Sequence, residues 1–110
     1  MTDTQPLNFS SDYCTLDDAV QLIAGRHKLA LIYAISQGHH HFGELGRIVY
    51  AVGRRTLAQQ LGELVRAKLV IKTQTLGFPP QTHYSLSIKG EGLLPIINQL
   101  CAWKAKEELS

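Results

Sequence analysis

Guanidinium and carboxamide side chains gather on one side of a helix expected at residues 54–68. At 100° per residue the leucines of this segment lie on one side, and Arg55, Gln59 and Arg66 lie on the other. Arginine donates two hydrogen bonds to guanine O6 and N7, and glutamine pairs with adenine N6 and N7 in a similar way. This face therefore has the chemistry to read base edges in a DNA major groove. The candidate contact residues on the helix are Arg54, Arg55, Thr56, Gln59, Gln60 and Arg66.

The segments around this helix support that interpretation, because an isolated helix with such a face is more often an ordinary solvated helix. A short helix at residues 44–49 and a turn at 50–53 precede it, and two alternating, strand-like runs follow within 70–86, around a hairpin tip at 76–80. This order predicts a winged helix-turn-helix, a mainly α fold (α+β) with a three-helix core and a small two-stranded wing. The candidate phosphate contacts on the wing are Lys72 and Gln74.

Further helices are expected around this unit. A first helix should begin at a cap, Thr15, and residues 27–37 are apolar nearly all round, which is typical of a buried central helix. A final helix from a cap at Ser87 to about Lys104 carries two apolar faces and should kink at Pro95. A helix with two apolar faces needs a partner beyond its own small core, so this segment predicts contact with a second molecule.

The length and composition suit one globular domain, since the chain has 110 residues and 45% hydrophobic content. We expect a flexible arm at residues 1–13 and a single domain at 14–106. No apolar run approaches the ~20 residues that cross a bilayer. The first residues lack a basic segment followed by an apolar one, so they do not resemble a secretory signal. These features predict a cytoplasmic protein.

Basic residues are concentrated in the middle of the chain. Residues 26–89 hold nine lysines and arginines against two glutamates, whereas residues 1–25 hold four aspartates and no lysine or arginine. A polyanion would be drawn to this middle section, with a strong dependence on salt. The alternative is an ordinary solvated surface whose charges are unevenly distributed by chance.

Catalytic and metal-binding motifs are absent from the sequence. It contains no glycine-rich phosphate loop, no nucleophile with a paired base and no HExxH, so we do not expect an enzyme. His39, His40 and His41 are adjacent, and adjacent residues of an extended segment point to opposite faces and rarely converge on one ion. We therefore expect no cofactor and no metal.

Short motifs follow one another along the chain in a specific order and spacing. They are Cys14, Gly25-Arg26-His27, His41-Phe42-Gly43-Glu44-Leu45, Arg55-Thr56-Leu57, Gln60-Leu61, Glu63-Leu64, Leu69-Val70, Pro79-Pro80, Tyr84-Ser85-Leu86-Ser87, Gly90, Leu94-Pro95 and Trp103. Each motif is short, but together they resemble the HxlR-type regulators, a branch of the MarR-like winged helix-turn-helix proteins. The resemblance spans about four-fifths of the chain.

Four positions depart from the pattern of that family. Arg26-His27 stands where the family has Lys-Trp, and His41 stands where the family has a basic residue. Gly53 replaces a serine at the head of the recognition helix, and His83 replaces an acidic residue before the wing tyrosine. The resemblance therefore implies that this chain has the family's fold. It does not extend to the family's groove contacts or its wing ion pair.

The resemblance implies a sequence-specific, DNA-binding transcriptional regulator, expected to be a homodimeric repressor. Helices at residues 14–25 and 88–105 would form the dimer interface, and the dimer would read a palindromic operator with half-sites about one helical turn apart. The implied partners are double-stranded DNA and a second copy of the chain, and a small-molecule or electrophile effector is a further candidate. The expected interface residues are Leu16, Val20, Leu94, Ile97, Leu100, Cys101 and Trp103.

Some members of the family, by the same resemblance, sense oxidants or electrophiles through a cysteine near the N-terminus. Cys14 stands there, just before the expected first helix, and a thiol at a helix N-terminus has a lowered pKa. Cys101 lies on the other interface helix, so the two are candidates for a disulfide between subunits. The alternative is that both are small buried hydrophobic residues.

A different class of function also fits the fold, namely a winged-helix module that binds protein without binding DNA. An apolar or acidic outer face on the helix at 54–68 would favour that alternative, and Arg55, Gln59 and Arg66 do not. A small-molecule sensor with a pocket between the interface helices and the central domain is compatible with DNA binding.

Overall fold

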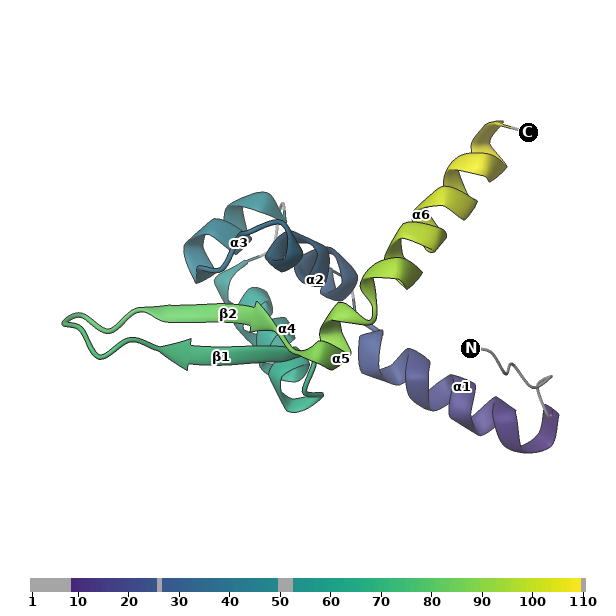
Figure 1. Cartoon of the computed structure of the whole chain (residues 1–110), viewed down its shortest axis with the longest axis horizontal. Coiled ribbons are helices and arrows are strands. Elements are labelled where there is room, and N and C mark those ends of the chain that lie inside the picture. The colour runs from purple at the N-terminus through teal and green to yellow at the C-terminus, as the bar shows by residue number, and fades with distance from the viewer. Residues whose placement is uncertain (1–8, 26, 50–52, 110) are drawn as a thin grey trace.

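The computed structural model describes residues 9–25, 27–49 and 53–109, with side chains from Leu16 to Lys106 within those ranges (Figure 1). Six helices and two strands follow one another in this part of the chain, and they form the predicted winged helix-turn-helix. The elements are α1 (Phe9–Ile23), α2 (Lys28–Ser36), α3 (Phe42–Ile48), α4 (Arg54–Arg66), β1 (Val70–Gln74), β2 (Thr82–Leu86), α5 (Ile88–Glu91) and α6 (Leu94–Leu109).

The core is built around α2, whose sequence KLALIYAIS is apolar on almost every side. Such a helix is stable only when other elements cover most of its surface. Leu45 of α3 and three leucines of α4 pack against it, together with Val70 at the start of β1. The fully buried side chains are Leu31, Ile32, Ile35, Leu45, Leu57, Leu61, Leu64 and Val70.

The wing is an antiparallel hairpin in which Val70 is opposite Leu86 and Gln74 is opposite Thr82. Its base joins the core through the buried side chains of Val70 and Tyr84, and Leu86 packs against the same core. The rest of the hairpin extends away from the helices, while α1 and α6 project at the opposite end of the molecule (Figure 1). None of the described helices is long and apolar enough to cross a bilayer.

The last helical segment differs from the expected single kinked helix. Ser87 caps as predicted, because its Oγ accepts a hydrogen bond from the Gly90 amide at 3.0 Å. However, α5 ends at Glu91 and α6 begins at Leu94, so the segment is two helices. Pro95 is the second residue of α6, and a proline in a first helical turn removes no helical hydrogen bond. The predicted kink at Pro95 was therefore wrong.

The first helix begins earlier than predicted, at Phe9 instead of after Thr15. No glycine or proline follows Pro6 in this region, so nothing in the local sequence stops the helix from extending. Residues 9–13 of the expected arm are helical, and residues 1–8 lie outside the described residues. Cys14 is consequently the sixth residue of α1 and does not lie just before the helix, as the sequence had predicted.

Candidate nucleic-acid interface

The outer face of α4 consists of exposed polar and basic residues above a row of buried leucines. Leu57, Leu61 and Leu64 hold the helix against α2, as their spacing predicted. The polar and basic residues that this anchoring leaves exposed are Arg54, Arg55, Thr56, Gln59 and Arg66. The helix begins after Gly53, whose extended backbone (φ −67°, ψ 158°) suits an N-cap that has no capping side chain. Five of the six predicted contact residues of the helix thus point to solvent together.

Gln60 is the exception among the predicted contact residues. Its side chain is half-buried, and its Oε1 is buried without a hydrogen-bond partner in the described structure. A Cβ built on Gly25 would lie only 2.7 Å from this oxygen, and Gly25 has a φ of +144°. Gln60 therefore packs toward the junction of α1 and α2, and Gly25 is required there by both space and backbone conformation.

Glu63 is the only acidic residue of α4, and the structure turns its charge toward the protein. Its Oε1 lies 2.8 Å from Lys28 Nζ, and its Oε2 accepts a hydrogen bond from Gln59 Nε2 at 3.3 Å. The Lys28 hydrogen bond lowers the pKa of Glu63 most, and Gln59 and the Arg66 charge act in the same direction, against partial desolvation. The carboxylate is therefore ionised, and the Lys28 ammonium balances its charge. It consequently does not weaken the positive potential of the outer face.

Lys28 is one of the nine basic residues of the middle section, but its side chain is buried. The residue is 5% exposed and lies among the core residues at the start of α2. The sequence provides little indication that Lys28 is buried, because it is a charged residue at the start of an otherwise apolar run. A buried charge needs a partner, and Glu63 supplies it from α4.

Arg54 connects the recognition helix to the helix before it. Its guanidinium carbon lies 5.6 Å from the ring centroid of Phe42, the first residue of α3. A guanidinium over an aromatic face is attracted by the ring. This contact holds Arg54 at the end of α4 that helix-turn-helix proteins usually insert first.

Three histidines tie the connector before α3 to the wing. His40 Nδ1 lies 2.8 Å from the Tyr84 carbonyl oxygen, and His41 Nδ1 lies 3.2 Å from that of Thr82. Because a carbonyl only accepts, both rings donate from Nδ1. The His83 ring stacks on His40 with centroids 4.4 Å apart and meets His41 edge-on at 5.8 Å.

The connector is also joined to the wing and to α3 by two further hydrogen bonds. The Tyr84 amide donates to the His40 carbonyl at 2.8 Å, so the connector pairs with β2 of the wing. His39 Nδ1 lies 2.8 Å from Glu44 Oε2, and this hydrogen bond lowers the pKa of Glu44. Within the described part of the chain, no three His, Cys, Asp or Glu side chains come together as ligands for one ion.

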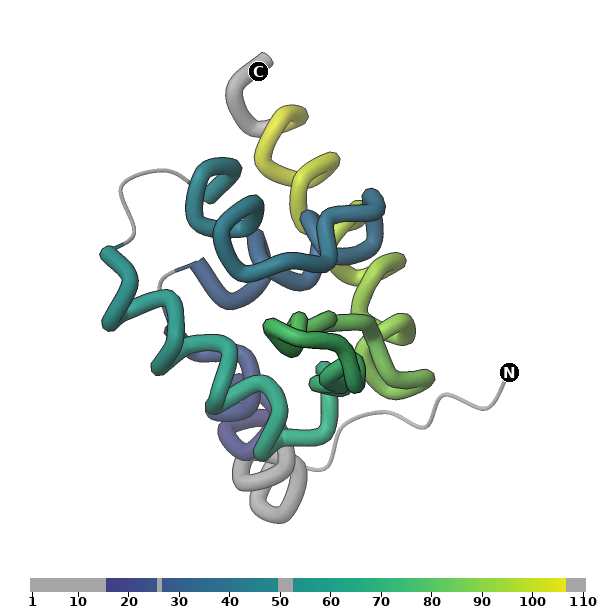
Figure 2. The backbone as a smooth tube through the Cα atoms, turned by 90° about the vertical axis from the view of Figure 1, so that its left-hand side faces the viewer, coloured from purple at the N-terminus to yellow at the C-terminus, as the bar shows by residue number. Residues whose placement is uncertain are grey.

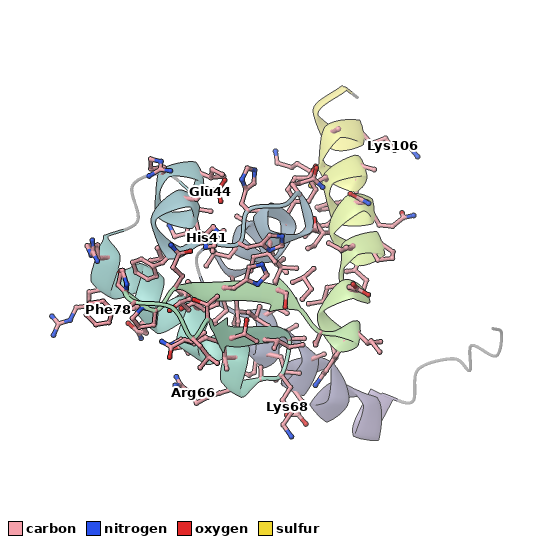
Figure 3. All side chains as sticks on the ribbon, turned by 60° about the vertical axis from the view of Figure 1, so that its left-hand side comes forward. His41, Glu44, Arg66, Lys68, Phe78 and Lys106 are labelled. Carbon is pink, nitrogen blue, oxygen red and sulfur yellow. The ribbon has the colours of Figure 1, made fainter. Side chains whose placement is uncertain are left out.

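The wing brings further polar residues to the side on which α4 is exposed. Lys72 and Gln74 are exposed on β1, and Gln74 Nε2 donates to Thr82 Oγ1 at 3.4 Å. In Figure 2 the wing points toward the viewer with α4 beside it, and in Figure 3 Phe78 lies at the left-hand edge with Arg66 below it, at the lower left. Lys106 lies far from both, near the end of α6 (Figure 3).

Apolar residues of α1 and α6 are exposed at the other end of the molecule. Trp103 is 61% exposed, and Leu16, Val20 and Leu100 are about half exposed. Leu94 is half-buried, and Ile97 is already buried in the core of its own chain. Cys101 is a free, exposed thiol on α6, while the side chain of Cys14 lies outside the described residues.

A buried central helix, a short helix and turn, an exposed second helix and a hairpin wing define the class of winged helix-turn-helix proteins. The sequence model of the HxlR-like helix-turn-helix family matches residues 22–109 of this chain. The chain belongs to the HxlR family, and it is a transcriptional regulator of the HxlR/MarR type.

Individual relatives agree with this assignment. An HTH-type transcriptional regulator of Halalkalibacterium halodurans is 36% identical over 90 residues, which cover 81% of this chain and 80% of the relative. The crystal structure of a MarR-family regulator from Enterococcus faecalis superposes with a TM-score of 0.82 at 26% identity, covering 96% of each chain. The reduced form of the redox regulator HypR superposes with a TM-score of 0.80 at 30% identity, covering 86% of this chain and 93% of HypR.

Proposed function

We propose that this regulator binds DNA in a sequence-specific way through α4 and the wing. The observation that carries the proposal is the joint exposure of Arg55, Gln59 and Arg66 above the buried leucines of α4. These groups are hydrogen-bond donors that suit base edges and phosphates, and the outer face of a protein-binding helix would be expected to be apolar or acidic instead. Family membership supports the same function.

Different residues would have different roles in this complex. Arg54, Arg55, Thr56 and Gln59 occupy the first two turns of α4, which enter the major groove in this class. Arg66 in the last turn and Lys72 and Gln74 on β1 would contact phosphates and so set the position of the helix on the duplex. The Gln59–Glu63 hydrogen bond would restrict the Gln59 amide before DNA binds.

We infer that the active form is a homodimer that represses transcription from a palindromic operator. The exposed apolar side chains of α1 and α6 lie at the end opposite the wing, where a second copy can cover them without blocking the DNA-binding side (Figure 1). Two-fold symmetry would place the two α4 helices in half-sites about one helical turn apart. The protein would act as a repressor where such a site overlaps a promoter.

A gel-shift experiment tests this function directly. The full-length protein is titrated against the DNA upstream of its own gene and against a random duplex, at two salt concentrations. We expect Arg55→Ala to weaken specific binding by roughly 1–3 kcal/mol. Lys106→Ala, which removes the same charge far from α4, should have little effect (Figure 3). Equal affinity for both duplexes in the wild type and in Arg55→Ala would contradict base readout.

A second candidate function, redox or electrophile sensing, is favoured by the similarity to HypR, which is described as a redox regulator. We propose Cys14 as the responsive thiol and Cys101, exposed on α6, as its candidate partner. The test compares operator binding before and after treatment with an oxidant or a quinone. Binding should weaken in the wild type and not in Cys14→Ser. If Cys14→Ser responds as the wild type does, this proposal is wrong.

A further inference from the structure

The wing ends in two large apolar side chains that no other described part of the chain covers. Leu76 and Phe78 are fully exposed, at 103% and 100% of their reference areas. Neither residue contributes to the hydrophobic core of the described structure. Large apolar groups exposed next to each other are characteristic of interaction surfaces.

The tip that carries them is held in place by the hairpin. The Thr75 amide donates to the Gln81 carbonyl at 2.9 Å, and the Gln81 amide donates to Thr75 Oγ1 at 3.0 Å. Pro79 and Pro80 restrict the backbone between these bonds, because the proline ring fixes φ. The apolar side chains are therefore presented on a narrow, constrained loop, which lowers the entropy lost when they bind.

The charges around the tip favour DNA as the surface that covers it. The sequence has no aspartate or glutamate between Glu63 and Glu91, and this interval contains Lys68, Lys72 and Lys89. The tip also projects from the same side as the basic outer face of α4 (Figures 2 and 3). A duplex that receives α4 in its major groove would therefore present an adjacent minor groove to the tip.

We propose that Phe78 and Leu76 form an apolar wedge that enters the minor groove, partly unstacks one base step and bends the duplex. Apolar side chains inserted between base pairs act in this way in proteins that bend DNA. Pyrimidine–purine steps unstack most easily, so the wedge would select a flexible step beside the bases that α4 contacts. This inference rests on the proposed DNA binding and adds a source of specificity that needs no hydrogen bond.

The test uses a duplex that the full-length wild-type protein selects from a randomised pool. One adenine at the flexible step nearest the wing footprint is replaced by 2-aminopurine, whose fluorescence rises when it is unstacked. Bending is measured separately, by the gel mobility of fragments that carry the site at different positions. The variants are Phe78→Ala, Leu76→Ala, Phe78→Leu and, as a matched control, Ile88→Ala. Ile88 is also a highly exposed apolar residue, but it lies on α5 at the base of the wing.

We expect the wild type to raise the fluorescence and to bend the duplex. Phe78→Ala should lose both effects and bind about tenfold more weakly, and Leu76→Ala should show a smaller loss. Phe78→Leu, which keeps an apolar wedge, should retain most of the bend, and Ile88→Ala should match the wild type.

Two results would overturn the inference, and they differ in what they say about the proposed function. If binding depends on Arg55 but Phe78→Ala bends the duplex as the wild type does, only the wedge is wrong, and a protein partner becomes the better explanation of the apolar tip. If the wild-type protein enriches no duplex from the pool, the wedge and the proposed DNA binding are both wrong.

Discussion

Lys28 Nζ lies 2.8 Å from Glu63 Oε1, so a buried ammonium at the start of α2 is paired with a partly exposed carboxylate in the last turn of α4. The same carboxylate accepts a hydrogen bond from Gln59 on the proposed DNA-binding face. One ion pair therefore links the buried core to the position of Gln59, a residue that is expected to contact a base.

The ion pair predicts unequal effects of removing its two partners. Glu63→Gln leaves a buried ammonium without a counter-charge, whereas Lys28→Met leaves a carboxylate that water reaches. We expect Lys28→Met to change the free energy of unfolding by less than about 1 kcal/mol. Glu63→Gln should be clearly more destabilising, and the double variant should resemble Lys28→Met. Urea unfolding followed by circular dichroism measures all three. Equal losses in the two single variants would indicate that water reaches Lys28 in solution.

The lowered pKa of Glu63 predicts a dependence of stability on pH. A carboxyl group whose pKa is lower in the folded than in the unfolded protein stabilises the fold above its unfolded pKa, near 4.5, and loses this contribution as pH falls through the folded value. The free energy of unfolding should therefore fall as the pH decreases below about 4.5. Glu63→Gln should show a smaller decrease over the same range. Urea titrations at several pH values compare the two proteins, and parallel curves would contradict the assignment.

Adding one methyl group at Gly90 should strongly lower the stability of the protein. A Cβ at this position would overlap the carbonyl oxygen of Leu69, which is backbone and cannot move independently of the wing. We expect Gly90→Ala to destabilise the protein by about 2 kcal/mol or more, measured by thermal or urea unfolding. Gly53→Ala is the comparison, because a Cβ on Gly53 meets no atom of the described residues within 4 Å, so this variant should show only the smaller cost of alanine at an N-cap. Similar losses in both variants would contradict the steric explanation.

Replacing Gly62 by alanine should have opposite effects on stability and on DNA binding. It lies within α4, and a Cβ there would make only an ordinary contact with Arg66, at 3.5 Å. Gly62→Ala should stabilise the protein by about 0.5–1 kcal/mol, because alanine favours the helix. It should also weaken operator binding if the missing side chain lets α4 approach the duplex closely. Unfolding and gel-shift measurements on the same variant separate the two effects, and unchanged affinity would argue against a close approach at Gly62.

The fluorescence of Trp103 should report the self-association of the protein. It is the only tryptophan of the chain and is 61% exposed on α6 in the single subunit. If the dimer covers it, its emission should shift to longer wavelength on dilution. Trp103→Lys should sediment as a monomer, while Ile88→Lys, which places the same charge at another exposed apolar site, should remain a dimer. A wild-type protein that sediments as a monomer at micromolar concentration would contradict the proposed interface.

The sequence by itself determined the order of the elements as far as the wing, and the exposed face of α4. Leucines at helical spacing have one stable arrangement against an apolar helix, so Arg55 and Gln59 had to face solvent once Leu57 and Leu61 were buried. The alternating runs before and after the prolines likewise predicted the hairpin, because strand periodicity is a local property.

Tertiary packing decided the features that depend on residues distant in the sequence. Lys28 is buried because Glu63 reaches it from another helix, and Gln60 turns inward because Gly25 leaves space for it. His40 and His83 stack because the wing folds back on the connector. The charge or shape of a partner many residues away controls each of these positions. The periodic pattern of the sequence does not indicate which residue that partner is. For the same reason, local signals misplaced the start of α1 and the break before α6, since the stability of a helix end depends on what surrounds it.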